Sequence, residues 1–183
     1  MNRVDSALKV SVGGVLAEKV LLSVFFFLGT VLGAYVEIPL PFTPVPITLQ
    51  TLFVLLGAAW LGTGWAAGVQ SLYLGSGALG ASVFAGAASG LFSLAGPSAG
   101  YLWAFLPASI LVGSLWPRAG RTFAGRAALM GAADVLILSA GTVWLALLLH
   151  VGPVRALLMG FVPFVPGEII KVVCAAAFAP RRA

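Results

Sequence analysis

Long apolar segments separated by short breaks make up most of the chain. The first runs from about Val15 to Val36. A second, Ile47 to Leu79, is too long for one membrane crossing, because an α-helix rises 1.5 Å per residue and the hydrocarbon core is about 30 Å thick. The break at Gly62–Gly64 supplies a turn within it. The pattern therefore predicts a helix over about 15–36 and two rather short helices over about 47–61 and 65–79.

Three more apolar helices are predicted in the second half of the chain, over about 99–116, 123–149 and 167–179. A short helix over Val154–Val162 precedes the last of them. Each of the six long segments resembles a membrane span in composition, and the chain length leaves room for little else. We therefore predict an all-α integral membrane protein that forms a single domain, residues 1–183, of six transmembrane helices.

Two connections have unusual compositions. The first, after Glu37, contains Pro39, Pro41, Pro44 and Pro46, and such dense prolines exclude a regular helix because each fixes φ and removes a backbone donor. The segment 80–97 is rich in Gly, Ala and Ser but remains apolar. We expect an extended proline-rich connection and a Gly-rich loop that packs over the protein between the third and fourth helices.

Composition agrees with a membrane protein, since 61% of the residues are hydrophobic and only 8% are charged, against roughly 25% charged residues in soluble domains. The net charge of +5 does not indicate nucleic-acid binding, because the basic residues form no surface interleaved with aromatic ones. Arg118, Arg121 and Arg126 would share one side with both termini, and Arg155 would lie on the other. By the positive-inside rule both termini are expected in the cytoplasm.

Few residues are available for catalysis. His150 is the only histidine and Cys174 the only cysteine, so the chain offers no cluster of metal ligands. No nucleophile and base set is recognisable, and no GxxxxGK[ST] phosphate-binding loop occurs. We expect neither an enzyme nor a bound metal or cofactor, and uphill transport would require a partner or an ion gradient.

A charge within a membrane span is costly and needs an explanation, and Asp134, Glu168 and Lys171 are the first candidates among the ionisable residues of the predicted spans. Glu168 and Lys171 are three residues apart, which places both on one helix face. They either form a mutual ion pair or contact a ligand that enters from outside, because Pro166 starts this helix near the outer side. Asp134 either bonds a neighbouring helix or Lys171, or contacts the ligand.

Uncharged candidates surround these positions in the predicted fold. Thr48 and Gln50 follow the prolines at the start of the second helix, where they either join helices or meet a ligand. Phe84, Tyr101 and Trp144 are aromatic residues of the core or the membrane interface that can also line an apolar pocket.

Gly29 and Gly33 form a small-xxx-small pair on the first helix. Such a pair predicts close approach of another helix. The pattern leaves open whether that helix belongs to this chain or to a partner protein.

Four segments, taken together, point to a known family. They are IPLPFTPVPITLQTLFVLLGAAWLG (Ile38–Gly62), GALGASVFAG (Gly77–Gly86), GPSAGYL (Gly96–Leu102) and FVPGEIIK (Phe164–Lys171). In this order and spacing the chain resembles the biotin-specific membrane subunits of energy-coupling factor transporters, the BioY family. The first and last segments are the more specific ones.

The resemblance implies a six-helix subunit in the cytoplasmic membrane of a bacterium or archaeon that captures biotin near the outer face. It would dock on a transmembrane coupling protein with two cytoplasmic ATPases, and Gly29 and Gly33 would contribute to docking. In the family an Asp usually stands at the position of Glu168, and this Asp and the Lys one turn later contribute to biotin binding. Two other hypotheses are a similar subunit for another small vitamin and a membrane scaffold that does not transport.

By this resemblance the candidate biotin contacts take different roles. Glu168 and Lys171 would accept from and donate to the ureido ring, and Gln50 or Thr48 would meet the remaining polar atoms. The apolar parts of biotin need apolar walls, for which the candidates are Phe84, Tyr101 and Trp144. Asp134 is retained as a further candidate, more structural in character.

Overall fold

The computed structural model describes residues 3–181, and side chains from Gly14 onward. Helices account for most of the described chain, with one two-residue β-ladder. The elements, in order, are α1 (Arg3–Tyr35), β1 (Glu37–Ile38), β2 (Ile47–Thr48), α2 (Gln50–Leu61), α3 (Thr63–Ala78), η1 (Ala85–Ala87), α4 (Gly90–Ser93), α5 (Ala99–Ala119), α6 (Phe123–Leu149), α7 (Pro153–Gly160) and α8 (Val165–Phe178).

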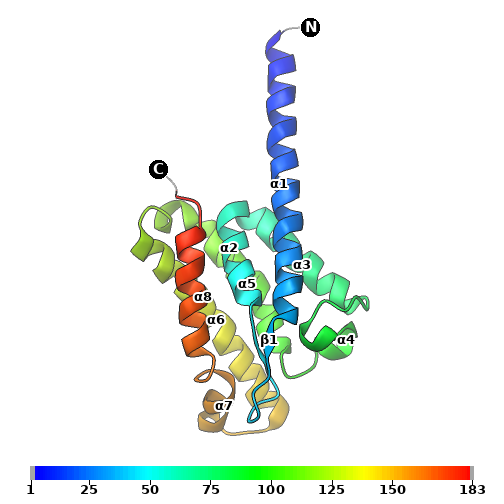
Figure 1. Cartoon of the computed structure of the whole chain (residues 1–183), viewed down its shortest axis with the longest axis vertical. Helices are drawn as coiled ribbons and strands as arrows, with labels where there is room; N and C mark the ends of the chain where they lie inside the picture. The colour runs from blue at the N-terminus through cyan, green and yellow to red at the C-terminus, as the bar shows by residue number, and fades with distance from the viewer. Residues whose placement is uncertain (1–2, 182–183) are drawn as a thin grey trace.

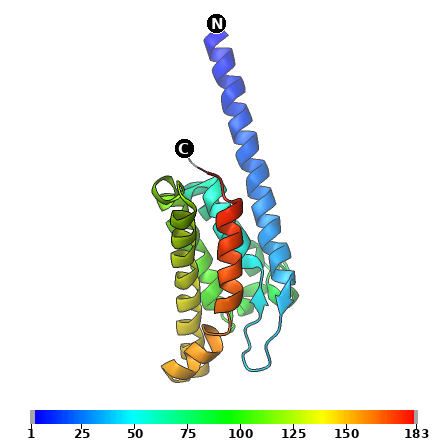
Figure 2. The same ribbon diagram turned by 60° about the vertical axis from the view of Figure 1, so that its left-hand side comes forward.

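The helices form a bundle from which the first part of α1 projects (Figures 1 and 2). The start of α1, the connection between α5 and α6 and the end of α8 lie at one end of the bundle (Figure 1). The β1–β2 hairpin, α4 and α7 lie at the other end. This is the arrangement expected if the prolines, the Gly-rich segment and the connection before the last helix share one face.

The three longest apolar segments are each long enough to cross a membrane: 22 residues of α1 (Gly14–Tyr35), α5 with 21 residues and α6 with 27. The pair α7 and α8, bent by 52°, can serve as a fourth, broken span. The helices α2 and α3 have 12 and 16 residues, fewer than the roughly 20 of a complete crossing. The chain is a multi-pass membrane protein, and the fold contains a helix in each of the six predicted regions.

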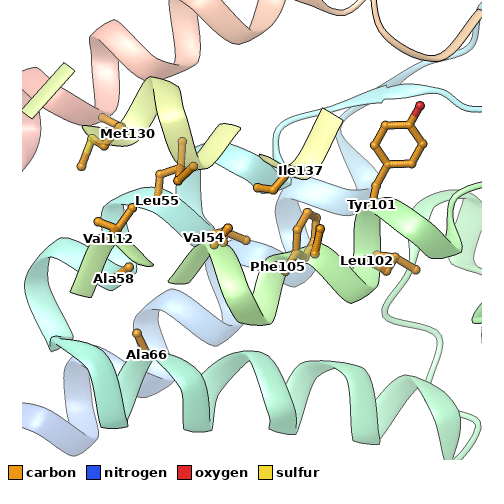
Figure 3. Packing of buried hydrophobic residues seen from close by; sticks show 14 of the residues in the cluster. Val54, Leu55, Ala58, Ala66, Tyr101, Leu102, Phe105, Val112, Met130 and Ile137 are labelled. Carbon is orange, nitrogen blue, oxygen red and sulfur yellow. The ribbon is translucent and has the colours of Figure 1, made fainter. Parts of the chain in front are cut away.

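The core lies where α2, α5 and α6 meet. Small residues bring these helices together, so that Ala58, Ala108 and Ala133 have no exposed surface. Larger apolar side chains fill the remaining space, as Figure 3 shows. They include Val54, Leu55, Phe105, Val112, Met130 and Ile137. On this core α8 packs against α2 and α6, and α1 packs against α2 and α3.

The break between α2 and α3 occurs at Gly62, as the sequence predicts. Its φ of +79° is a conformation that residues with a side chain rarely adopt. Lys19 of α1 donates hydrogen bonds of 3.1 Å to the carbonyl oxygens of Trp60 and Leu61 at the end of α2. A helix end leaves such carbonyls without an intrahelical partner. The ammonium group of Lys19 therefore stabilises the turn between α2 and α3, at the end of the bundle opposite the hairpin.

The proline-rich connection is extended, as predicted, and also forms a hairpin that the sequence does not indicate. Glu37 pairs with Thr48 and Ile38 pairs with Ile47 in antiparallel register. Because Ile47 and Thr48 belong to this ladder, α2 begins at Gln50, three residues later than the predicted start at 47. The hairpin therefore delivers Thr48 and Gln50 to the same end of the bundle.

Gly29 and Gly33 are buried between α1 and α2. A Cβ atom at Gly33 would lie 3.0 Å from the backbone nitrogen of Gln50, and one at Gly29 would lie 2.4 Å from the ring of Phe53. The predicted close approach of another helix is thus internal to the chain. Because α2 covers both glycines, their contribution to docking on a partner stays a prediction that these contacts do not support.

Candidate functional site

A cavity of about 560 Å³ lies at the hairpin end of the bundle, opposite the start of α1. Five segments form its walls: the hairpin with the start of α2, the Gly-rich segment, the start of α5, the middle of α6 and the start of α8. The lining residues include Glu37, Pro44, Pro46, Thr48, Gln50, Thr51, Phe84, Phe92, Ser98, Tyr101, Leu102, Phe105, Ile137, Leu138, Phe164 and Glu168. Most of the wall is apolar, with polar groups concentrated where α2 meets α8.

Glu168 and Lys171 form an ion pair within the first turns of α8. Pro166 stands in the first turn, where its missing N–H costs nothing, and Glu168 follows where a negative charge favours the helix dipole. Both side chains are buried, with 5% and 6% of their surfaces exposed. Removing two charges from solvent is costly, so further hydrogen bonds are needed to hold them.

Those hydrogen bonds come from α2 and the hairpin. The hydroxyl of Thr51 donates to Glu168 Oε2 at 2.8 Å, and Lys171 Nζ donates to the carbonyl oxygen of Thr48 at 2.7 Å as well as to Glu168. Glu168 lines the cavity, whereas Lys171 is not among the lining residues and lies behind it. The structure thus brings Glu168 of the predicted pair to the cavity wall, and Lys171 bonds it from behind.

Asp134 is also buried, with 4% of its surface exposed, and lies on α6 beside Glu168 and Lys171. It does not line the cavity. Its Oδ1 has no hydrogen-bond partner among the described residues. Asp134 thus lies close to both members of the ion pair, and its position fits support of the pair better than direct contact with a ligand.

Gln50 and Thr48 lie side by side in the wall, as expected, and are joined to a residue that the sequence does not single out. The Thr48 hydroxyl donates to Gln50 Oε1 at 3.0 Å, and Gln50 Nε2 donates to the hydroxyl of Tyr73. Tyr73 in turn donates to the carbonyl oxygen of Val83 at 2.9 Å. A continuous series of hydrogen bonds thus runs from the hairpin through α2 and α3 to the Gly-rich segment.

Phe84 and Tyr101 both line the cavity, as predicted for its apolar walls. The ring of Phe84 fills the space left by Gly77, where a Cβ atom would come within 2.0 Å of it, and packs edge-on against Tyr73 with ring centroids 5.4 Å apart. Tyr101 donates a hydrogen bond of 2.6 Å to the carbonyl oxygen of Gly160. These contacts fix the Gly-rich segment and the end of α7 beside the cavity.

Trp144 is not among the residues that line the cavity, so a direct contact between its ring and a ligand stays a prediction that the structure does not support. Its side chain packs over Gly100, where a Cβ atom would lie 2.3 Å from Trp144 Cβ, and faces the outer groove between α5 and α6. The indole nitrogen donates to the carbonyl oxygen of Gly96 at 2.8 Å. The helical period predicts which residues share a face of α6. Which of these faces turns toward the cavity depends on how α6 packs against α5 at Gly100, and the period does not reveal this.

Several cavity residues are absent from the sequence-based candidates. Thr51 differs from Gln50 by one position, and its role depends on the meeting of α2 with α8, which are far apart in sequence. Glu37 stands in the hairpin at the cavity wall. The apolar lining residues Phe105 and Phe164 carry no sequence signal that separates them from other core residues.

Comparisons with known proteins identify the family to which the chain belongs. The model of the BioY family matches residues 4–183. The chain is 40% identical over 152 residues to the biotin transporter BioY of Thermotoga maritima, which covers 82% of this chain and 87% of that protein. It is 34% identical over 165 residues to the probable biotin transporter BioY of Pyrococcus horikoshii, with 90% and 96% covered.

A solved structure has the same fold. It is the crystal structure of the S-component for biotin from an ECF-type ABC transporter, with a TM-score of 0.84, 22% sequence identity, and coverage of 90% of this chain and 89% of that one. The relatives are described as transporters, which agrees with the expectation that the chain is not an enzyme. By the match over nearly its full length, the chain belongs to the BioY family.

Proposed function

We propose that this protein captures biotin in the cavity at the hairpin end and delivers it across the membrane as the substrate-specific subunit of an energy-coupling factor transporter. The observation that carries the proposal is the composition of the cavity: one polar corner, where Glu168, Thr48, Gln50 and Thr51 meet, and walls that are mostly apolar apart from Glu37, Ser93 and Ser98. Its volume of about 560 Å³ lies within the range of roughly 300 to 1,000 Å³ typical of small-molecule sites.

The chemistry of biotin matches this division. Its ureido ring has two N–H donors and one carbonyl acceptor, and its thioether ring and carbon chain are apolar. Glu168 Oε1 and Oε2 and Gln50 Oε1 are acceptors for the ureido N–H groups, and a charge-assisted bond to the carboxylate is the stronger kind. Phe84, Tyr101 and Phe105 provide apolar surface for the rest of the molecule.

Lys171 and Asp134 take supporting roles in this proposal. Lys171 holds the Glu168 carboxylate and the hairpin carbonyl of Thr48 at once, so that it orients the acceptor that biotin meets. If biotin draws Glu168 toward the cavity, the ammonium can follow and donate to the ureido oxygen. Asp134 then remains as the second carboxyl group near Lys171 and compensates its charge.

The same proposal includes six crossings, by α1, α2, α3, α5, α6 and α8, and cytoplasmic termini in the inner membrane of a bacterium or archaeon. The distribution of arginines supports this orientation. Arg118 lies in the last turn of α5 and Arg121 between α5 and α6, at the end that also holds the start of α1, whereas Arg155 lies on α7 at the cavity end. With basic residues preferred inside, the cavity faces outward.

Energy for uptake comes from other subunits in this account. The sequence has no phosphate-binding loop of the ATPase type. A transmembrane coupling protein with cytoplasmic ATPases is the partner that such a transporter requires. Because α2 covers Gly29 and Gly33, we expect residues on exposed helix faces to contribute to the docking surface beside or in place of these two glycines.

Titration of the purified protein in detergent with biotin and desthiobiotin tests the proposal. We expect saturable binding of one biotin per chain and competition by desthiobiotin, which keeps the ureido ring. Competition by unrelated vitamins at similar concentrations would instead favour a subunit for another small heterocycle. An absence of saturable biotin binding, with a monodisperse protein on size-exclusion chromatography, would overturn the proposal.

A further inference from the structure

Tyr73 connects the polar corner of the cavity to the Gly-rich segment, although it does not line the cavity itself. Its side chain is completely buried on α3. The hydroxyl accepts from Gln50 Nε2 and donates to the carbonyl oxygen of Val83 at 2.9 Å. Val83 directly precedes Phe84, whose ring both lines the cavity and packs against the ring of Tyr73.

Tyr73 has a single hydroxyl proton, and the acceptor of this proton determines how the side-chain amide of Gln50 is oriented. A phenol hydroxyl has one proton to donate. While the Gly-rich segment is in place, that proton is used by the Val83 carbonyl, so Gln50 must turn its NH₂ group toward Tyr73. The amide oxygen then accepts from Thr48 at 3.0 Å and remains available as an acceptor in the cavity wall.

Movement of the Gly-rich segment would remove this constraint. Without the Val83 carbonyl, the Tyr73 proton is free to be donated to Gln50 Oε1. The terminal torsion of a glutamine side chain is broad and roughly two-fold, so the amide can reverse and present NH₂ to the cavity instead. The position of the segment thus decides whether Gln50 offers an acceptor or a donor.

We propose that Tyr73 is a positioning residue which couples closure of the Gly-rich segment over the cavity to the orientation of the Gln50 amide. A ligand with N–H donors favours Gln50 Oε1 in the wall, and through Tyr73 it favours the closed position of Val83 and Phe84. This inference rests on the proposed capture of biotin, because the ureido ring supplies those donors.

The test compares biotin binding and amide hydrogen exchange of residues 82–88 in the full-length wild type, Tyr73→Phe and Thr30→Val. Phenylalanine keeps the buried ring but removes the hydroxyl, so Gln50 Nε2 and the carbonyl oxygen of Val83 each lose the hydrogen bond to Tyr73. We expect about tenfold weaker biotin binding in Tyr73→Phe, together with loss of most of the exchange protection that biotin confers on residues 82–88.

Thr30→Val is the matched control. It removes another completely buried hydroxyl, which donates to the carbonyl oxygen of Phe26 in its own helix and does not line the cavity. We expect this variant to retain wild-type affinity and biotin-dependent protection. A shared loss in both variants would assign the effect to general destabilisation and overturn the positioning role.

The outcomes separate this inference from the proposed function. Wild-type protein that fails to bind biotin refutes the proposed function itself. Wild-type binding together with unchanged affinity and unchanged protection in Tyr73→Phe refutes only the role of Tyr73. If Tyr73→Phe does not fold, Gln50→Leu replaces it: we expect weak binding and no biotin-dependent protection of residues 82–88, and full protection there would contradict the coupling.

Discussion

The hydroxyl of Thr51 on α2 donates a hydrogen bond of 2.8 Å to Glu168 Oε2 on α8, across a sequence separation of 117 residues. With Lys171 on the other carboxylate oxygen, Glu168 is held from two sides. Its remaining lone pairs face the cavity that it lines. The contact therefore orients the one negatively charged group in the polar corner where α2 meets α8.

Replacing Thr51 with Val tests the importance of this contact. Valine has nearly the same shape and removes only the donor, so we expect biotin affinity to fall by about 1 kcal/mol, or roughly fivefold, as Glu168 loses its fixed orientation. Isothermal titration calorimetry of Thr51→Val beside Thr30→Val provides the comparison. Equal affinities in the two variants would show that Lys171 alone suffices to orient the carboxylate.

The Glu168 and Lys171 pair predicts unequal effects of its two single substitutions. Lys171→Met leaves Glu168 and Asp134 buried together without a cation, and we expect destabilisation of about 3 to 5 kcal/mol. In Glu168→Gln the ammonium still has Asp134 nearby and the Thr48 carbonyl as acceptor, so the loss should be smaller, about 1 to 2 kcal/mol. The melting temperatures of both variants in detergent measure the difference.

A third variant provides the control for this comparison. Adding Asp134→Asn to Lys171→Met removes one of the two stranded carboxylates and should recover part of the lost stability. A melting temperature of the double variant below that of Lys171→Met would contradict the proposal that Asp134 lies close enough to the ion pair to affect its stability. Equal losses in Lys171→Met and Glu168→Gln would contradict it too.

The polar corner was largely predictable because its main parts are local in sequence. A spacing of three residues places Glu168 and Lys171 on one face of any helix, and the prolines imply that a helix starts close to Thr48 and Gln50. The contribution of Tyr73 was not predictable. It depends on the direction of the Val83 carbonyl, which is set by the path of the Gly-rich backbone. The residue types in this segment do not indicate that direction.

Phe84 and Trp144, both predicted as cavity walls, should respond differently to substitution. Phe84→Ala opens the wall and removes the ring that fills the space at Gly77, so we expect biotin affinity to fall at least about tenfold, in addition to a loss of stability. Trp144→Phe removes a contact on the outer groove. Its affinity should stay within about threefold of wild type, and a larger loss in a biotin titration would place Trp144 in the site after all.

We expect Gly33→Ala to lower the stability of the protein and to leave its docking on a partner intact. An alanine Cβ there would lie 3.0 Å from the backbone of Gln50, so α1 and α2 must separate slightly, and we expect destabilisation of about 1 to 3 kcal/mol. Gly68→Ala on α3 is the control, because its Cβ would meet nothing within 4 Å and alanine favours a helix. Thermal unfolding compares the two, and an unchanged melting temperature with lost partner assembly in Gly33→Ala would restore the docking role.

The fold could be predicted at the level of helices but not of their partners. Apolar lengths and the Gly62 break locate the helix ends to within a few residues, except that α1 begins at Arg3 and not near Val15, because its first turns are not apolar. The small residues Gly29 and Gly33 indicate that some helix comes close, but only the assembled bundle shows that it is α2. The β1–β2 ladder escaped prediction because it has two residues per strand and lies among prolines, which usually indicate irregular structure.

The central claim is that biotin binds in this cavity against Glu168. Equilibrium dialysis of labelled biotin against wild-type protein and Glu168→Gln, both monodisperse in detergent, measures it most directly. We predict one saturable site per chain in the wild type and at least about tenfold weaker binding in the variant, since a charge-assisted acceptor is replaced by a neutral one. Wild-type protein without saturable binding, or a variant that binds biotin as tightly as wild type, would contradict the account.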